Sequence, residues 1–240
     1  MRSFLFFIGL GTALIAAGCD RGVPTLPLAE AAARDDLDAV RKLVAARHAV
    51  NERDASGLTP LMWAARKDAA AVMTALLDAG ADVDARDARH EWTALQHAIH
   101  TQRVDAVRLL LDRGADPNAK THPEALTPLL MAAGDRDPGI VKLLLAHGAD
   151  PRHQGEWGVT PLARAVSGGP LVDIDRPSLG GCRAATVRAL LAQDPRLRLP
   201  DNLAGRLALL WARVHVAAEH DPGELCADVL ELLHKGKRLM

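Results

Sequence analysis

The sequence predicts an all-α fold, a solenoid in which one helix-turn-helix unit repeats along the chain. Two short sequence motifs recur with nearly the same period, and aromatic residues are scarce. The first marker is a Thr followed by Leu and small residues, and it returns after 34, 34 and 33 residues: TPLMWAA at 59–65, TALQHAI at 93–99, TPLLMAA at 127–133 and TPLARAV at 160–166. The second marker, Gly-Ala-Asp, returns every 34 residues at 80–82, 114–116 and 148–150.

The amino-acid composition favours particular folds and particular classes of binding partner. The 240 residues include four Trp, no Tyr and three Phe, all within the first ten positions. The remaining core must use Leu, Val and Ala, which favours closely packed helices over a β-sandwich. The chain has 29 basic and 30 acidic residues, so no strong basic field favours nucleic acid as a partner. An apolar content of 49% with balanced charge also argues against disorder.

Residues 1–18 have the pattern of a signal peptide. Arg2 precedes an uncharged, mostly apolar run of 15 residues at 3–17, which is shorter than a membrane span of about 20 residues. Small residues then lead to Cys19, and this arrangement resembles the bacterial lipoprotein signal, in which the cysteine is lipidated and becomes the new N-terminus. Ala16 departs from the usual Leu, so an ordinary cleaved signal and a short uncleaved anchor remain alternatives.

The lipoprotein resemblance implies a location. Residues 19–25 would form a lipidated tether at the periplasmic face of a bacterial membrane, where two or more acyl chains hold a protein stably. Asp20 resembles the signal that retains enteric lipoproteins at the inner membrane. The inner membrane is therefore favoured, and the outer membrane is the alternative.

The markers predict the unit boundaries. Thr59, Thr127 and Thr160 can N-cap a helix whose first residue is Pro, and glycines end the second helices. A pair of leucines recurs in the second helices, at 76–77, 110–111 and 144–145. Counted from Thr160, the next pair is expected at 177–178 but occurs 13 residues later, at 190–191. This displacement predicts a Gly- and Pro-rich inserted loop. The predicted units are an N-terminal capping repeat at 26–58, repeats at 59–92, 93–126 and 127–159, a repeat at 160–200 with the inserted loop at 167–182, and a C-terminal capping unit at 201–240, with helices at 202–218 and from Asp221.

These repeats resemble ankyrin repeats across most of the chain. The family's usual His after Thr-Pro-Leu is replaced by Met62, Gln96, Leu130 and Ala163, so we expect its hydrogen-bond network to be absent and packing to couple the repeats. Glu91 and Ala125 replace a family Gly at the hairpin base, which predicts strain if φ is positive there. The resemblance implies partner binding on the concave face formed by hairpin tips and first helices.

On that face, the residue before each Thr is apolar, and two Trp side chains lie two repeats apart. We therefore expect protein contacts from Leu58, Trp92, Leu126, Trp157 and Val159. Packing of Trp92 on the next repeat is the alternative, whereas Trp63 is expected in the core.

Catalytic and metal-binding patterns are weak. His97 and His100 share a helical face without a third ligand, and no nucleophile elbow, metalloprotease motif or phosphate-binding loop occurs. We expect no enzyme activity, cofactor or metal. A hydrolase whose site uses Asp173 and Asp175 in the inserted loop is the least favoured alternative.

The sequence thus predicts an exported, lipid-anchored ankyrin-repeat protein that binds another protein, such as an envelope protein. The main alternative is a periplasmic immunity protein that neutralises a delivered toxin. No binding to nucleic acid is expected.

Two further cysteines are available for a bridge. Aligning Leu190 with Leu232 places Cys182 two residues from the position opposite Cys226, and Gly180 and Gly181 supply flexibility. In an oxidising periplasm we expect a Cys182–Cys226 disulfide. Two buried free thiols are the alternative.

Replacing Cys19 tests the lipid anchor. We expect Cys19→Ser to release the protein from membranes or to leave its precursor uncleaved, because the lipid acceptor is lost. Cell fractionation and gel mobility measure both effects, with Cys182→Ser as the control that keeps the acceptor. Normal retention and processing of Cys19→Ser would contradict the lipoprotein interpretation.

Overall fold

The computed structural model describes residues 24–122, 125–134, 138–167, 182–217 and 226–235. Within these ranges all regular structure is helical, which confirms the predicted all-α fold. Residues 1–23, which include Cys19 and Asp20, and the loop that carries Asp173 and Asp175 lie outside the described residues. The helices are α1 (Pro27–Ala33), α2 (Leu37–Ala45), α3 (Pro60–Lys67), α4 (Ala70–Asp78), α5 (Ala94–His100), α6 (Val104–Asp112), α7 (Pro128–Ala132), α8 (Gly139–Ala146), the 3-10 helix η1 (Glu156–Gly158), α9 (Pro161–Ser167), α10 (Ala184–Gln193), α11 (Leu203–Ala217) and α12 (Cys226–Lys235).

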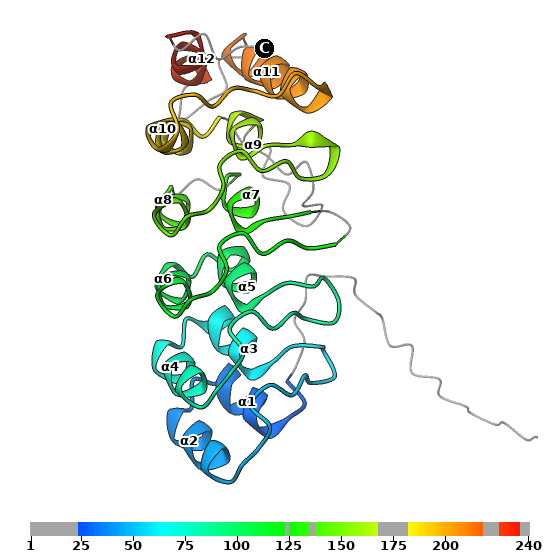
Figure 1. Cartoon of the computed structure of the whole chain (residues 1–240), viewed down its shortest axis with the longest axis vertical. Coiled ribbons are helices and arrows are strands. Elements are labelled where there is room, and N and C mark those ends of the chain that lie inside the picture. The colour runs from blue at the N-terminus through cyan, green and yellow to red at the C-terminus, as the bar shows by residue number, and fades with distance from the viewer. Residues whose placement is uncertain (1–23, 123–124, 135–137, 168–181, 218–225, 236–240) are drawn as a thin grey trace, which may run out of the picture.

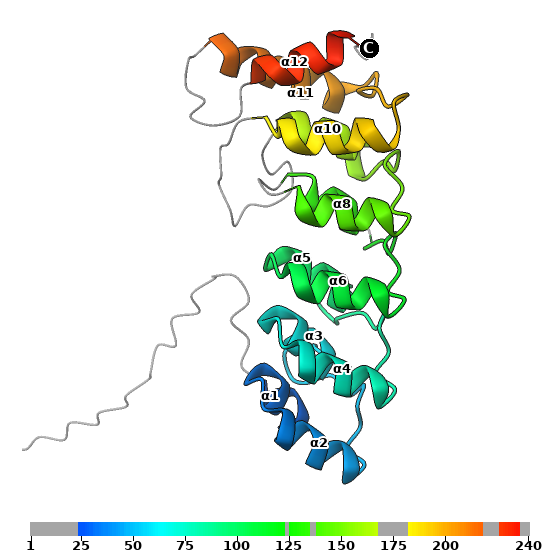
Figure 2. The same ribbon diagram turned by 90° about the vertical axis from the view of Figure 1, so that its left-hand side faces the viewer.

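The α-helices form consecutive pairs that stack into an elongated solenoid (Figure 1). The first helices of the pairs (α1, α3, α5, α7, α9 and α11) form one column, and the second helices form another, which faces the viewer in Figure 2. Hairpins project to the side of the first helices. Among the described residues, no helix combines the length and apolarity needed to cross a membrane.

The repeated Thr begins each of the interior first helices. The side-chain oxygens of Thr59, Thr93, Thr127 and Thr160 accept hydrogen bonds from the backbone N–H three residues later, at 3.2–3.4 Å. Gly80, Gly114 and Gly148 follow second helices with φ of 86–88°, as expected for left-handed helix ends. Caps and helix ends therefore recur with the sequence period.

Small and branched apolar side chains form one continuous core. Leu61, Leu95, Leu129 and Leu162 of the first helices are fully buried. Met73, Val107, Val141 and Val187 take the corresponding places in the second helices. Because the contacts between helices run mainly from each unit to the next, the core extends along the stack rather than around a centre.

Two substitutions in the ankyrin pattern have visible consequences. Glu91 and Ala125 adopt positive φ angles of 57° and 48°, the strained conformation that the missing glycines predict. The expectation that no hydrogen-bond network replaces the family His is wrong at Gln96. Its Oε1 accepts from the Thr93 N–H at 3.0 Å, and its Nε2 donates to the Leu126 carbonyl of the next unit at 3.1 Å. A side-chain amide has one acceptor and two donors, so Gln can cap its own helix and also link two repeats.

The C-terminal units follow the predicted plan. The helix expected at 202–218 is α11, Leu203–Ala217. The final helix is described from Cys226, and its expected start at Asp221 lies outside the described residues. Cys182 and Cys226 are buried and form a disulfide with a Cα–Cα distance of 5.1 Å. This bond links the residues just before α10 to the start of α12.

The disulfide can be tested by thiol counting. We expect no free thiol in the processed, lipidated protein denatured without reductant, because Cys182 and Cys226 are bridged. Cys226→Ala should lower the free energy of unfolding by up to about 4 kcal/mol, since the bridge closes a loop of 44 residues in the unfolded chain. Two free thiols per chain would show that the bridge does not form.

Candidate protein-binding surface

The apolar residues before each Thr are mostly not available to a partner. Leu58, Leu126 and Val159 are only 2%, 9% and 7% exposed, so their prediction as contact residues is wrong. Their carbonyls accept hydrogen bonds from the hairpin bases, at Asp54 N, Thr121 N and Gly155 N, over 3.0–3.2 Å. This pairing fixes the extended strand-like segment and turns each side chain into the core.

A buried aspartate closes the first of these hairpins. Oδ1 of Asp54 accepts from the backbone N–H of Ser56 and Leu58, and its Oδ2 accepts from the Trp63 indole at 2.9 Å. Trp63 is accordingly buried in the core, as expected. The indole N–H thus satisfies the carboxylate that anchors the hairpin.

The next hairpin repeats this arrangement with a histidine. Asp87 accepts from the backbone N–H of Arg89 and His90, and its Oδ2 lies 2.9 Å from His97 Nε2. Both side chains are buried. Burial raises the pKa of Asp87, but the hydrogen bond from His97 and the backbone hydrogen bonds outweigh it and lower the pKa to about 2. His97 therefore holds a hairpin together instead of ligating a metal, and no metal-binding cluster occurs among the described side chains.

Trp92 is partly buried rather than an open anchor. Its ring centroid lies 5.1 Å from that of His90, 5.4 Å from His97 and 5.0 Å from His100. The indole is thus surrounded by imidazoles on the hairpin side of α5. This position favours the packing alternative and leaves only part of the ring for a partner.

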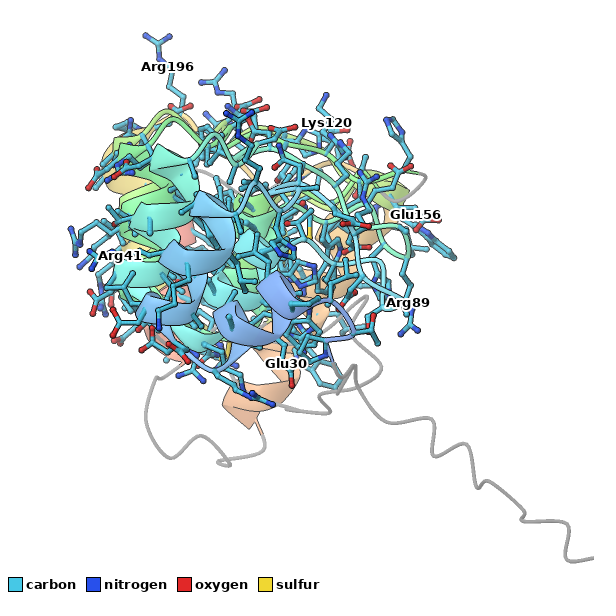
Figure 3. All side chains as sticks on the ribbon, turned by 90° about the horizontal axis from the view of Figure 1, so that it is seen from below. Glu30, Arg41, Arg89, Lys120, Glu156 and Arg196 are labelled. Carbon is cyan, nitrogen blue, oxygen red and sulfur yellow. A yellow bond between two sulfur atoms is a disulfide. The ribbon has the colours of Figure 1, made fainter. Side chains whose placement is uncertain are left out.

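Trp157, in contrast, is 76% exposed. It lies in η1 at the tip of the fourth hairpin and has a φ of 61°, which is costly for a bulky residue. Asn202 donates from Nδ2 to the Gly158 carbonyl at 3.0 Å, which ties this tip to the last unit. In Figure 3, the neighbouring Glu156 lies on the hairpin side of the molecule, far from Arg41 of α2.

Sequence analysis missed a second exposed apolar group on α11. Leu203, Leu207, Leu210 and Trp211 are exposed by 64%, 43%, 57% and 38%. The sequence does contain a signal for this exposed group, because the four residues recur at helical spacing beside a separate stripe of alanines. Together with Trp157, these are the large apolar side chains that the described surface exposes.

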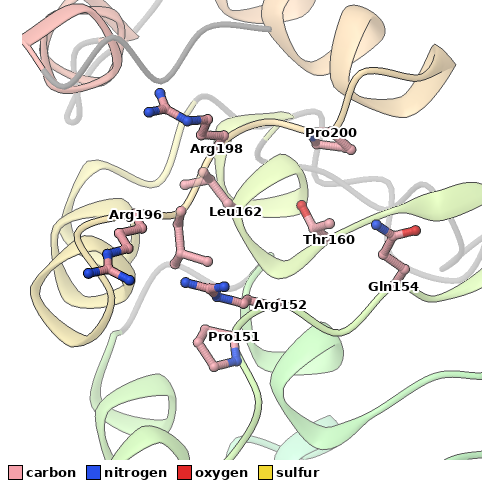
Figure 4. Close-up of a pocket in the computed structure, with 9 residues that line it drawn as sticks. Pro151, Arg152, Gln154, Thr160, Leu162, Arg196, Arg198 and Pro200 are labelled. Atoms are coloured by element: carbon pink, nitrogen blue, oxygen red, sulfur yellow. The ribbon is translucent and has the colours of Figure 1, made fainter.

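A small pocket lies between the fourth hairpin and the segment before α11 (Figure 4). It encloses about 240 Å³ and is lined by Arg152, Arg196 and Arg198 together with Thr160 and Leu162. Arg152 is paired with Asp194 at 2.6 Å. Backbone and Arg152 hydrogen bonds lower the pKa of Asp194. The three arginines are exposed, and the buried Thr160 hydroxyl accepts from the Ala163 N–H to cap α9, so the described lining offers little to orient a ligand.

Two family profiles match the stacked units. The profile for ankyrin repeats in three copies matches residues 28–121, and the profile for a single ankyrin repeat matches residues 126–156. The chain belongs to the ankyrin-repeat family. Ankyrin-repeat proteins are typically non-enzymatic scaffolds that bind other proteins, and neither match indicates a catalytic family. Trp157 and α11 lie beyond the two matched ranges.

The Asp87–His97 pair predicts an acid-dependent loss of stability. The pKa of Asp87 is about 2 in the folded protein and about 4 when unfolded, so its contribution is present above pH 4 and disappears as the pH falls through 2. We expect Asp87 to contribute about 2 kcal/mol to the wild type at neutral pH.

Urea unfolding at pH 5.5 and pH 2.5 measures this contribution. Asp87→Asn should be less stable at pH 5.5 and lose less on acidification than the wild type. Asp105→Asn, at an exposed helix position, serves as the control. Equal pH dependence of Asp87→Asn and the wild type would contradict the assignment.

Proposed function

We propose that this ankyrin-repeat protein is exported, anchored by lipid at Cys19, and binds another protein through the hairpin side of its solenoid around Trp157. The proposal for the binding surface rests on one observation, the exposed indole of Trp157. The lipoprotein-like run before Cys19 supports the anchor.

Trp157 has the properties of an interface anchor. A tryptophan buries about 150–250 Å² when covered, and such rings dominate the energetics of protein interfaces. Here the backbone holds the ring outward in a left-handed conformation, with Gly158 bonded to Asn202 behind it. A rigidly presented ring loses little conformational entropy on binding.

The solenoid would separate the anchor from the binding surface. The described chain starts at Pro24, next to α1 at one end of the stack, and η1 lies several units away (Figures 1 and 2). Under this proposal, the tether at 19–25 attaches the α1 end to the bilayer. The hairpin that carries Trp157 would then project where a partner at the membrane surface can reach it.

Toxin neutralisation is a narrower form of the same activity. An anchored binder at the membrane would intercept a toxin that attacks the membrane or the cell wall. Co-expression with the exported product of the neighbouring gene tests this form, because protection should require Trp157. If the toxin kills cells equally well with and without the ankyrin-repeat protein, neutralisation of that toxin is excluded.

Substitution of Trp157 tests the binding surface. A partner captured from solubilised membranes and purified should bind Trp157→Ala more weakly by more than about 1 kcal/mol, because the exposed ring is lost. Trp92→Ala should have a smaller effect, since its ring is partly buried. Titration calorimetry measures both affinities.

Trp211→Ala is the matched control, because it removes a partly exposed tryptophan from α11 and should leave this affinity unchanged. Circular dichroism verifies the fold of each variant. Unchanged affinity of folded Trp157→Ala would move the interface elsewhere.

A further inference from the structure

Helix α11 has two apolar faces instead of one. Ala204, Ala208 and Ala212 are buried on the side that packs against α9. Beside this buried face, residues at positions i, i+4, i+7 and i+8 form an exposed apolar stripe, which we term the α11 stripe: Leu203, Leu207, Leu210 and Trp211.

The α11 stripe lies where a further unit would stack. The chain repeats one contact along the solenoid, in which α1 packs on α3, α3 on α5, α5 on α7, α7 on α9 and α9 on α11. Helix α11 is the last first helix and lies at the end of the column (Figure 1). Large exposed apolar residues on the outer side of a stacked helix point to a covering surface.

The opposite end of the solenoid has the ordinary polar cap. Helix α1 exposes Arg34, which pairs with Glu30, and α2 exposes Arg41 and Lys42. In Figure 3, viewed from this end, Glu30 and Arg41 lie on its surface. Stacking the α11 stripe of one copy on the charged α1 end of another would bury charges against leucines. Head-to-tail assembly, which would also continue without limit, is therefore disfavoured.

We propose that two copies of this chain associate end to end, with the α11 stripe of one copy packed against the α11 stripe of the other across a two-fold axis. Such an interface matches apolar with apolar surface and closes after two copies. It continues the helix-on-helix stacking already present between the units. It is argued from residues of α11 and not from Trp157, so this inference does not depend on the proposed function.

The geometry of one helix limits the strength of this contact. The 15 residues of α11 extend over about 22 Å. With the two helices antiparallel, Leu207 and Leu210 lie nearest the axis. The contact falls in the small interface class, below about 1,200 Å² in total. We therefore expect a dissociation constant in the micromolar range in solution.

Sedimentation of the full processed protein in mild detergent tests the assembly. Mass should increase from monomer to dimer with concentration. Leu207→Glu and Leu210→Glu should each weaken association by at least tenfold, because a carboxylate would be buried between leucines. Both positions are exposed in the single chain, so these variants should keep the fold, which circular dichroism verifies. Trp157→Ala is the control that should dimerise normally.

A cross-link distinguishes the two-fold arrangement from other contacts. Residue 210 of one copy meets residue 210 of the other only across the axis, so Leu210→Cys alone should give a covalent dimer with a short bismaleimide. Arg41→Cys, at the opposite end, should not. A monomer at all concentrations up to several hundred micromolar would overturn the proposal. So would a dimer that Leu210→Glu leaves intact, or a stripe that binds lipid vesicles while the protein stays monomeric.

Discussion

The close stacking of successive first helices is the constraint on which the rest of this structure depends. Neighbouring helices can approach to about 8–10 Å only where the side chains between them are small. Ala64, Ala98, Ala132 and Ala165 occupy the same column of consecutive units, and all are fully buried. A larger residue in this column would separate two units and expose the leucines on both sides. The chain contains no other folding unit within its described residues, so this column positions every hairpin.

Hairpin anchoring changes along the stack. The equivalent hairpin-base positions hold Asp54, Asp87, Thr121 and Gly155. The two aspartates fasten their hairpins to Trp63 and His97, whereas Thr121, among the described residues, accepts from the Leu126 N–H, and Gly155 has no side chain to contribute. The last hairpin is fastened instead from the C-terminal unit, through Asn202. Trp157 is exposed in the hairpin that lacks the internal anchor, so its presentation depends on the C-terminal cap.

Sequence reasoning recovered the parts of the structure that repeat. The Thr caps, the glycine helix ends and the core position of Trp63 all follow from a fixed place in a periodic unit. The side-chain directions of Leu58, Leu126 and Val159 did not follow, because periodicity assigns a place in the unit but not the side to which an extended residue turns. The α11 stripe was missed for a related reason. The terminal unit lacks the markers, and only the packing of Ala204 and Ala208 on α9 shows which of its two apolar faces is outside.

The disulfide between Cys182 and Cys226 changes how this repeat array can unfold locally. In a solenoid each unit is held only by its neighbours, so terminal units open first and protease access begins at the ends. Here the last second helix is tied covalently to the one before it. We therefore expect the final two units to loosen together, whereas the described residues at the α1 end have no such covalent tie. In an anchored molecule, that end would be the one closest to the bilayer, and the outward end would be the durable one.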